Sequence, residues 1–177
     1  FIPETIGSIV YLSRNLDYLK KYVIAGFNIT CVGDDRCYSY LPSRDGNTLS
    51  DMAALHVLKH IDPEFNRYTW LDRGSDERQY CAPGIDLPIA TIMRSKYGEY
   101  PEYHTALDDL SLVTSSGLEG GFTAMKKTLE VIEQNVFLKT TVFGEPQLGK
   151  RGLYEPIDPN NPSQSVRTYT LSRGRHS

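Results

Sequence analysis

The sequence has 177 residues, 40% of them hydrophobic and 23% charged, which suits one globular domain with its own core. Its formal net charge of -3 creates no positive field, so we expect no nucleic-acid partner. No apolar run reaches the ~20 residues that span a bilayer, so we expect no membrane association. Three cysteines, an odd and sparse count, favour a reducing compartment and predict a cytoplasmic protein.

The first part of the chain alternates between extended and helical patterns. Residues 1–3 are expected to end a buried strand. Residues 8–20 repeat apolar side chains every three or four positions, which predicts a helix. Residues 22–32 (YVIAGFNITCV) are β-branched, aromatic and nearly uncharged, which predicts a central strand. Residues 37–41 (CYSYL) predict a further extended segment.

The same alternation continues through the middle of the chain. A helix that reaches His60 is predicted, with Thr48 or Asn47 as its N-cap, and residues 68–71 (YTWL) predict a short strand. Residues 87–93 (LPIATIM) form a continuous apolar run, typical of a strand buried on both faces. Residues 117–134 predict a helix whose apolar stripe packs flat on the sheet. This stripe comprises Leu118, Phe122, Met125, Leu129 and Ile132. The order predicts an α/β fold with a mostly parallel mixed sheet flanked by helices.

The two ends of the chain lack the alternation of helical and extended patterns seen between them. Residues 144–177 are rich in proline, glycine and arginine, which predicts an extended arm or linker after a folded part at residues 1–143. The chain begins FIPETIGS, inside an apolar run and without an initiating methionine. We therefore expect it to be part of a longer protein.

Three side chains with metal-binding or acid–base chemistry each follow a predicted strand: Glu4, Asp76 and His104. Because the carboxyl ends of parallel strands meet at one edge of a sheet, we expect these residues to share one site. A glutamate carboxylate and an imidazole are ordinary zinc ligands, and a further carboxylate can orient the imidazole or act as a general base. Tyr103 is a candidate hydrogen-bond donor to an oxyanion.

The residue pattern alone leaves a second interpretation open. A single loop histidine is more often not a ligand, and Asp76 and Glu77 suit helix caps or solvated charges equally well. Glu4 could instead stabilise a helix dipole. The sequence contains no H-E-x-x-H, no G-x-S-x-G and no phosphate-binding glycine loop. Spacing alone therefore makes the metal site a hypothesis.

The residues around these positions resemble a known superfamily. SDERQYCAPGIDLPIATIMRS followed by EYHTALDDL is similar to the zinc-dependent aminopeptidase superfamily, which includes bacterial leucyl aminopeptidases and glutaminyl cyclases. In that superfamily an S-D segment, then G-I-P, then Y-H-T-x-x-D occur in this order. The opening PETIGS resembles its glutamate-bearing metal-ligand turn. Segments such as FIPETIGSIVYLSRN and WLDRGSDERQYCAPGIDLP more closely resemble a little-characterised bacterial aminopeptidase-like branch associated with polysaccharide biosynthesis, over about residues 1–154.

The resemblance implies a three-layer, phosphorylase/hydrolase-like α/β domain that is incomplete at its N-terminus. Residues 1–143 would be the C-terminal part of its catalytic domain. His104 falls on the final zinc ligand of the superfamily and Glu4 on its glutamate turn. Asp76 falls on an aspartate that supports catalysis in glutaminyl cyclases without binding the metal.

Two departures from the superfamily pattern bear on this site. The opening turn has one glutamate where the superfamily has two, so it cannot supply both a ligand and a general base. Thr30 stands where the superfamily usually has an aspartate, and whether Asp34 takes its place is left open. We therefore expect one zinc ion, with its remaining ligands upstream of Phe1.

These observations support three functional hypotheses. The first is a zinc-dependent metallopeptidase-type hydrolase that cleaves an amide or peptide bond through a metal-activated water, with Glu4 and His104 as metal ligands and Glu4, Asp76 and Tyr103 in catalytic roles. The second is a catalytically degenerate aminopeptidase-like module for binding or regulation. The third is glutaminyl-cyclase-like acyl transfer. The expected partners are a peptide or an amide-containing small substrate, and either a second copy or the absent N-terminal half.

Overall fold

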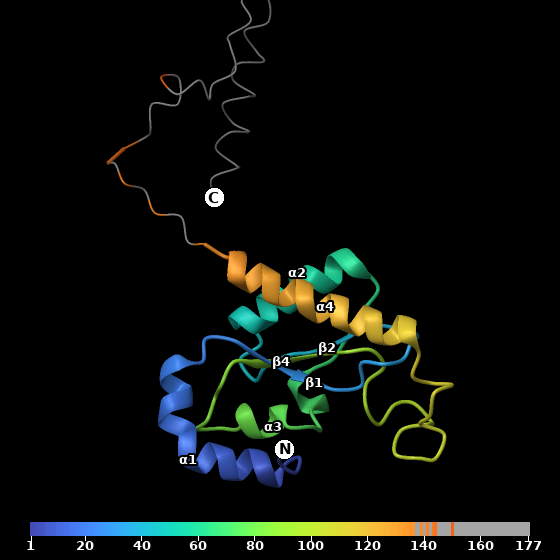
Figure 1. The fold of residues 1–177 in the computed structure, drawn as a ribbon. Coiled ribbons are helices and arrows are strands. Elements are labelled where there is room, and N and C mark those ends of the chain that lie inside the picture. The colour runs from blue at the N-terminus through green and yellow to red at the C-terminus, as the bar shows by residue number, and fades with distance from the viewer. Residues whose placement is uncertain (137–138, 140, 142, 145–149, 151–177) are drawn as a thin grey trace, which may run out of the picture. The chain divides into compact units, whose positions relative to one another are not determined.

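A computed structural model describes residues 1–136, 139, 141, 143, 144 and 150 (Figure 1). The chain divides into two compact units, Phe1–Asn135 and Val136–Ser177, and the helices and strands named below belong to the first. Most of the predicted arm at residues 144–177 lies outside the described residues, and the predicted boundary after residue 143 stays a prediction. None of the helices in the described part is long and apolar enough to cross a membrane.

A four-stranded mixed sheet forms the middle layer of the first unit. Its strand order is β1 (Gly26–Ile29), β4 (Ile89–Met93), β2 (Ser39–Leu41) and β3 (Asn66–Arg67). β1 pairs with β4 in parallel, and β2 pairs with β3 in parallel, whereas β2 and β4 are antiparallel. The predicted mostly parallel mixed sheet is therefore confirmed.

Helices cover both faces of this sheet. In Figure 1, α2 (Leu49–Ile61) and α4 (Ser115–Gln134) lie on one face, and α1 (Ile6–Tyr22) and α3 (Glu77–Tyr80) lie on the other. Contacts of α2, α3 and α4 with β4 hold the layers together. The three-layer α/β architecture is thus the predicted one, and a cluster of buried apolar side chains fills the space between the sheet and the pair α2 and α4.

Of the two predicted N-cap residues of α2, Asn47 and Thr48, the structure uses Thr48, which forms a reciprocal cap. Thr48 Oγ1 accepts a hydrogen bond from the Asp51 backbone N–H, and Asp51 Oδ2 accepts one from the Thr48 N–H at 2.8 Å. Asp51 is fully buried and also accepts hydrogen bonds from the Tyr40 hydroxyl (2.7 Å) and the Ser43 N–H (2.9 Å). Burial alone would raise the pKa of Asp51, but the hydrogen bonds from Ser43, Thr48 and Tyr40 outweigh it and lower that pKa.

The prediction for residues 22–32 was only partly right. α1 continues to Tyr22, and strand pairing begins only at Gly26. β4 pairs with one side of β1, and the described residues place no strand on the other side, so β1 is an edge of this sheet and not its centre. An apolar composition reports how much of a strand is buried, but it does not report how many neighbours the strand has.

The predicted extent of α4 is confirmed, but the predicted packing face is wrong. The residues of α4 that are buried are small: Gly117, Gly121, Ala124 and Thr128. A Cβ atom at Gly121 would lie 2.6 Å from the Val32 carbonyl oxygen, and one at Gly117 would clash with the Gly33 carbonyl, so only glycine permits this approach.

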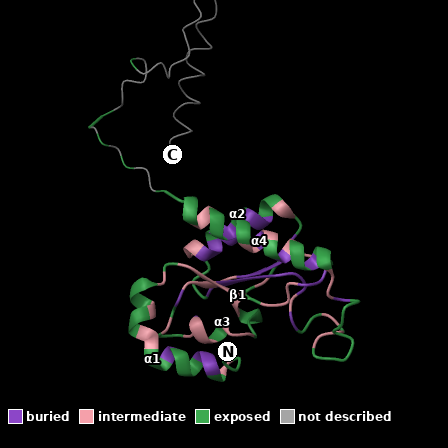
Figure 2. Cartoon of the chain, in the orientation of Figure 1, coloured by how far each residue is buried: buried purple, intermediate pink, exposed green. Residues whose placement is uncertain are grey.

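The large apolar side chains of α4 lie mainly outside the core. Leu118, Phe122 and Leu129 are 49%, 68% and 50% exposed, and exposed residues run along the outer side of this helix in Figure 2. The 3.6-residue periodicity correctly identified an apolar stripe, but it cannot identify the surface that covers the stripe.

Two other predicted strands are absent from the described chain. Residues 1–3 are exposed and form no strand. At residues 68–71 the pairing ends at Arg67 and a short 3₁₀ helix, Trp70–Asp72, follows. Asp72 causes this change locally, because its Oδ2 accepts hydrogen bonds from both the N–H and the hydroxyl of Thr69 at 2.8 Å. A polar cap of this kind overrides the β propensity of YTWL.

Candidate active site

The structure brings Glu4 and Asp76 together, although they lie far apart in the sequence. Ser75 Oγ donates a hydrogen bond to Glu4 Oε1 at 2.8 Å, and the Thr5 N–H donates one to Asp76 Oδ1 at 2.7 Å. Thr5 has a φ of 61°, in the left-handed region that favours glycine, and the bond to Asp76 holds this strained residue at the start of α1. Asp76 therefore positions the turn that carries Glu4.

The carboxylate of Glu77 fixes the loop that makes this contact, and the sequence did not predict this role of Glu77. Its side chain is fully buried. Oε1 accepts hydrogen bonds from the Gly74 N–H (2.8 Å), the Ser75 N–H (3.0 Å) and the Tyr97 hydroxyl (2.7 Å), and Oε2 accepts one from Asn28 Nδ2 (2.9 Å). One carboxylate thus joins β1, the loop before α3 and the segment after β4. It fixes the Ser75–Asp76 loop on which Glu4 rests.

Burial of the Tyr97 ring, followed by its hydrogen bond to Glu77, raises the pKa of Tyr97. The phenol therefore stays protonated and keeps donating to Glu77. In the sequence, Glu77 is one more acidic residue in a polar loop, next to Asp76. Only its position directly after the S-D pair could have drawn attention to it.

His104 and Tyr103 line a cavity of about 400 Å³ at the end of β1. The other lining residues come from segment 30–34, from the loop after β4 and from the start of α4: Thr30, Cys31, Val32, Gly33, Asp34, Tyr100, Asp108, Leu112, Val113 and Leu118. The ring of His104 stacks on that of Tyr103, with centroids 3.9 Å apart and planes 16° from parallel. His104 and Cys31 both have positive φ values, 59° and 48°, so the cavity wall contains two strained residues.

Burial raises the pKa of Tyr103, and interactions with Cys31 and Glu4 raise it further. Tyr103 therefore remains a protonated hydrogen-bond donor at neutral pH. The structure groups the predicted site residues in two pairs: Glu4 and Asp76 in contact through adjoining residues, and Tyr103 and His104 stacked together. Of these four residues, Tyr103 and His104 line the cavity.

One ion pair and one group of hydrogen bonds hold the loops around the cavity. Arg36 forms a bidentate pair with Glu102, with distances of 3.0 Å and 2.5 Å, and so anchors the loop that carries Tyr103. Asp34 is buried, and its carboxylate accepts hydrogen bonds from the Arg36 N–H (3.0 Å), the Ser95 N–H (2.9 Å) and the Ser95 hydroxyl (2.8 Å). Both Asp34 oxygens tie the β1 and β4 loops together, which gives Asp34 a structural role.

Residues 1–135 match the family model described as Domain of unknown function (DUF4910). The chain belongs to the DUF4910 family. A Clostridium acetobutylicum protein, provisionally named a polysaccharide biosynthesis protein with aminopeptidase-like domain, is 41% identical over 158 residues. The match covers 89% of this DUF4910 chain and 36% of that protein. The predicted resemblance to an aminopeptidase-like family linked to polysaccharide biosynthesis is confirmed.

Solved structures support the same fold for the DUF4910 chain. A crystal structure of a provisionally assigned peptidase from Clostridium acetobutylicum superposes with a TM-score of 0.75 at 40% identity, over 86% of this chain and 36% of that one. An aminopeptidase from Aneurinibacillus sp. strain AM-1 gives a TM-score of 0.56 at 18% identity, over 71% of this chain and 29% of that one, and supports the fold alone. The DUF4910 chain spans about a third of the length of the relatives it matches.

The described residues of the DUF4910 chain supply a partial donor set for zinc. Glu4 and His104 are suitable ligand types, but zinc sites use at least three protein ligands. Within the described ranges, no group of three or more His, Cys, Asp or Glu side chains lies close enough to hold a metal ion. These residues alone therefore do not complete a zinc centre, and the predicted ligand roles of Glu4 and His104 stay predictions.

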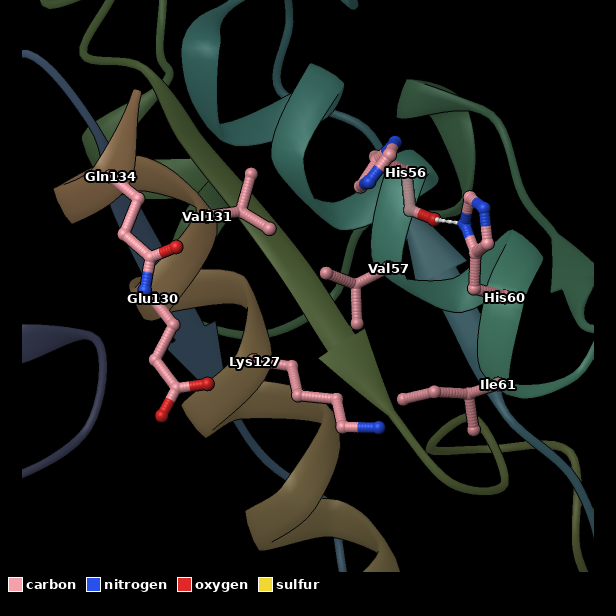
Figure 3. A pocket seen from close by; sticks show the side chains of 8 residues that line it. All are labelled: His56, Val57, His60, Ile61, Lys127, Glu130, Val131 and Gln134. Atoms are coloured by element: carbon pink, nitrogen blue, oxygen red, sulfur yellow. Dashed lines mark hydrogen bonds between the residues drawn. The ribbon is translucent and has the colours of Figure 1, made fainter. Parts of the chain in front are cut away.

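A separate cavity of about 240 Å³ lies between α2 and α4 of the DUF4910 chain (Figure 3). His56 and His60 line it from α2, and Lys127 and Glu130 line it from α4. His60 Nδ1 donates to the His56 carbonyl oxygen at 2.7 Å, a contact within the helix. None of the four predicted site residues lines this cavity, so it is distinct from the candidate active site.

Proposed function

We propose that this chain is part of a zinc-dependent, aminopeptidase-like hydrolase that cleaves an amide or peptide bond. Glu4 and His104 would bind the metal, Asp76 would position the Glu4 turn, and Tyr103 would face the reacting carbonyl. Because the described residues do not complete a zinc site, the proposal assigns the remaining ligands to the rest of the full-length protein. The substrate would be a peptide or a small molecule that contains an amide bond.

The observation that carries this proposal is the contact between the Glu4 turn and the Ser75–Asp76 loop. Two segments 71 residues apart in sequence meet through two hydrogen bonds, from Ser75 to Glu4 and from Thr5 to Asp76. Thr5 in this contact and His104 in the cavity wall both have left-handed backbones. Strained residues of this kind cluster at functional sites.

Each residue contributes a definable part of amide hydrolysis. When bound, zinc supplies Lewis-acid activation of a water molecule. Ser75 holds one oxygen of Glu4 and leaves the other free to act as a ligand or a base. Tyr103, whose pKa is raised, can donate a hydrogen bond to the developing oxyanion at neutral pH. Stacking on Tyr103 fixes the plane of the His104 imidazole.

A second function is supported by a specific observation. The described residues contain no group of three metal-binding side chains, and the cavity is lined by Thr30 where the resembling superfamily usually has an aspartate. Both features suit an aminopeptidase-like module that binds a ligand without hydrolysing it. Metal content distinguishes the two functions, because only the hydrolase requires zinc.

The test is the zinc content of a full-length protein that contains this chain, purified without chelator and measured by mass spectrometry. We expect about one zinc ion per chain, lost in His104→Ala and retained in the matched control His56→Ala, whose imidazole is exposed on α2. Stoichiometric zinc in His104→Ala would refute the ligand role of His104. Absence of zinc from the unmutated protein would favour the non-catalytic module.

If zinc is present, hydrolysis of a panel of aminoacyl amides follows. Tyr103→Phe removes only the hydroxyl, so we expect kcat to fall while zinc content stays the same. Unchanged turnover in Tyr103→Phe would show that this hydroxyl does not contact the reacting carbonyl.

A further inference from the structure

Two exposed histidines on α2 line the cavity between α2 and α4 (Figure 3). His56 and His60 lie four residues apart, so they project from the same face of the helix on successive turns. Their ring centroids are 4.7 Å apart, and the ring planes are 47° from parallel. Neither ring belongs to the candidate active site, so the pair has no role in the proposed hydrolysis.

The separation of the two rings suits two ligands of one metal ion. Imidazole nitrogens bind zinc at about 2.1 Å, and the ring centre lies about 1.1 Å behind the nitrogen. For ligand–metal–ligand angles of about 90–110°, two ring centres are then about 4.5–5.2 Å apart. The observed 4.7 Å falls within this range. Both side chains are exposed, so rotation about their χ angles can direct both lone pairs at one ion.

The hydrogen bond of His60 gives its ring the tautomer of a metal ligand. His60 Nδ1 lies 2.7 Å from the His56 carbonyl oxygen, which can only accept, so Nδ1 carries the proton. In the neutral imidazole the free lone pair is then on Nε2. Histidines that bind metals commonly donate their other ring N–H to a backbone carbonyl in the same way. The backbone of α2 therefore prepares His60 to bind an ion through Nε2.

The charge around the cavity also favours a cation. Its lining residues lie in the C-terminal turns of α2 and α4, which end at Ile61 and Gln134. The carbonyl groups at a helix C-terminus carry a partial negative charge that stabilises a nearby cation. Among the lining side chains Glu130 offsets Lys127, and α4 has no basic residue in its last turn.

An anionic ligand fits this cavity less well. Lys127 would attract an anion, but Glu130 and the C-terminal ends of two helices would repel it. The His56 carbonyl already takes the Nδ1–H of His60, so the neutral ring has no N–H left to donate to an anion.

We propose that His56 and His60 together bind a divalent transition-metal ion of the zinc, nickel and copper class. These ions accept imidazole ligands, whereas magnesium and calcium take oxygen ligands. The described residues bring no group of three metal-binding side chains together, so the site has two protein ligands and its other coordination positions are open to water. This inference does not depend on the proposed hydrolase activity.

The number of ligands distinguishes this site from the candidate active site. An ion on two protein ligands exchanges more readily than an ion on three or four, so dialysis would remove it and leave the zinc of the hydrolase in place. The bound ion would also link successive turns of α2 and would stabilise the folded chain by mass action.

The test is a calorimetric nickel titration of a dialysed full-length protein that contains this chain. We expect a nickel site whose affinity falls more than about tenfold in His56→Ala and in His60→Ala, because loss even of a hydrogen-bond partner of a metal ligand costs about that much. The matched control His104→Ala removes a histidine from the other cavity and should leave this affinity unchanged. Lys127→Gln removes a like charge and should tighten binding about two- to fivefold.

A spectroscopic count of the ligands separates direct coordination from indirect effects of the substitutions. With one Cu²⁺ ion added per dialysed chain, electron spin-echo modulation should detect two coordinated imidazoles in the unmodified protein. It should detect one in His56→Ala and one in His60→Ala.

Three outcomes would overturn the proposal. The first is an unchanged nickel affinity in either histidine variant of α2. The second is an equal loss of affinity in His104→Ala, which would assign the ion to the other cavity. The third is a single coordinated imidazole in the unmodified protein.

Discussion

Glu77 gives the sharpest prediction, because four donors converge on one fully buried carboxylate. Hydrogen bonds to a charged group contribute about 1.5–3 kcal/mol each, with strong non-additivity. Glu77→Ala leaves four donors without an acceptor, so we expect it to lower the free energy of unfolding by about 4–5 kcal/mol. Glu77→Gln keeps one oxygen in place of Oε1, and Asn28 can rotate its amide to accept from the new NH₂ group. We therefore expect a smaller loss of about 1–2 kcal/mol.

The partnership between Asn28 and Glu77 can be tested by exchanging their roles. Asn28→Asp alone places a second carboxylate 2.9 Å from Glu77, and we expect a loss of about 3 kcal/mol at pH 7. In the double variant Asn28→Asp with Glu77→Gln, the glutamine NH₂ can donate to the new carboxylate. Its stability should lie within about 1 kcal/mol of Glu77→Gln alone, which corresponds to a favourable coupling energy of about 2 kcal/mol.

The assay is urea unfolding of the 177-residue chain, followed by circular dichroism and by the fluorescence of its only tryptophan, Trp70. Glu130→Gln is the matched control, because it makes the same chemical change at an exposed position that pairs, among the described residues, only with Lys126 at 3.8 Å. We expect this control to change the free energy of unfolding by less than about 0.5 kcal/mol. If Asn28→Asp costs as much in the Glu77→Gln background as in the unmodified chain, the assigned hydrogen bond does not exist.

Three further predictions concern stability and loop order. Asp51→Asn should lower the free energy of unfolding by about 2–3 kcal/mol at pH 7. The pKa of Asp51 is lowered in the folded state, so its carboxylate stabilises the fold above the unfolded pKa of about 3.9. This stabilisation is lost as the pH falls through the folded-state pKa. Urea titrations should therefore show a smaller difference in unfolding free energy between Asp51→Asn and the unmodified chain at pH 3 than at pH 7. Gly117→Ala should destabilise the chain by about 2–3 kcal/mol in thermal unfolding, because its methyl meets backbone, whereas Gly120→Ala meets the ends of long side chains and should cost less than about 1 kcal/mol. Arg36→Ala should change the free energy of unfolding by less than about 1 kcal/mol, because its ion pair with Glu102 is exposed to solvent. It should nevertheless speed hydrogen exchange at the Tyr103 amide, because the pair holds the loop that carries Tyr103. Unchanged exchange at Tyr103 would contradict this anchoring role.

Features determined by neighbouring residues were predictable from the sequence. The start of α2 at Thr48 depends on Asp51, three residues away, and the β4 strand depends on one continuous apolar run. The approximate ends of α4 also follow from its own periodicity. In each case the stabilising contacts lie within the segment itself, so the local pattern contains the necessary information.

Features determined by distant partners were not predictable. Glu77 is a buried acceptor because Asn28 and Tyr97, 49 and 20 residues away, converge on it. The buried face of α4 lies so close to the backbone of Val32 and Gly33 that only small residues fit there. Four site residues were predicted from the resemblance and from their positions after strands. The structure pairs Glu4 with Asp76 and Tyr103 with His104, and the shared site of all four stays a prediction.

A path of hydrogen bonds joins β1 to the candidate site. Asn28 on β1 donates to Glu77 Oε2, Glu77 Oε1 accepts from the Ser75 N–H, and the Ser75 hydroxyl donates to Glu4. A change that displaces Asn28 would therefore reach the carboxylate of Glu4 through three successive hydrogen bonds. Preorganised ligands bind and react better than mobile ones, so an ordered β1 would also order the carboxylate of Glu4.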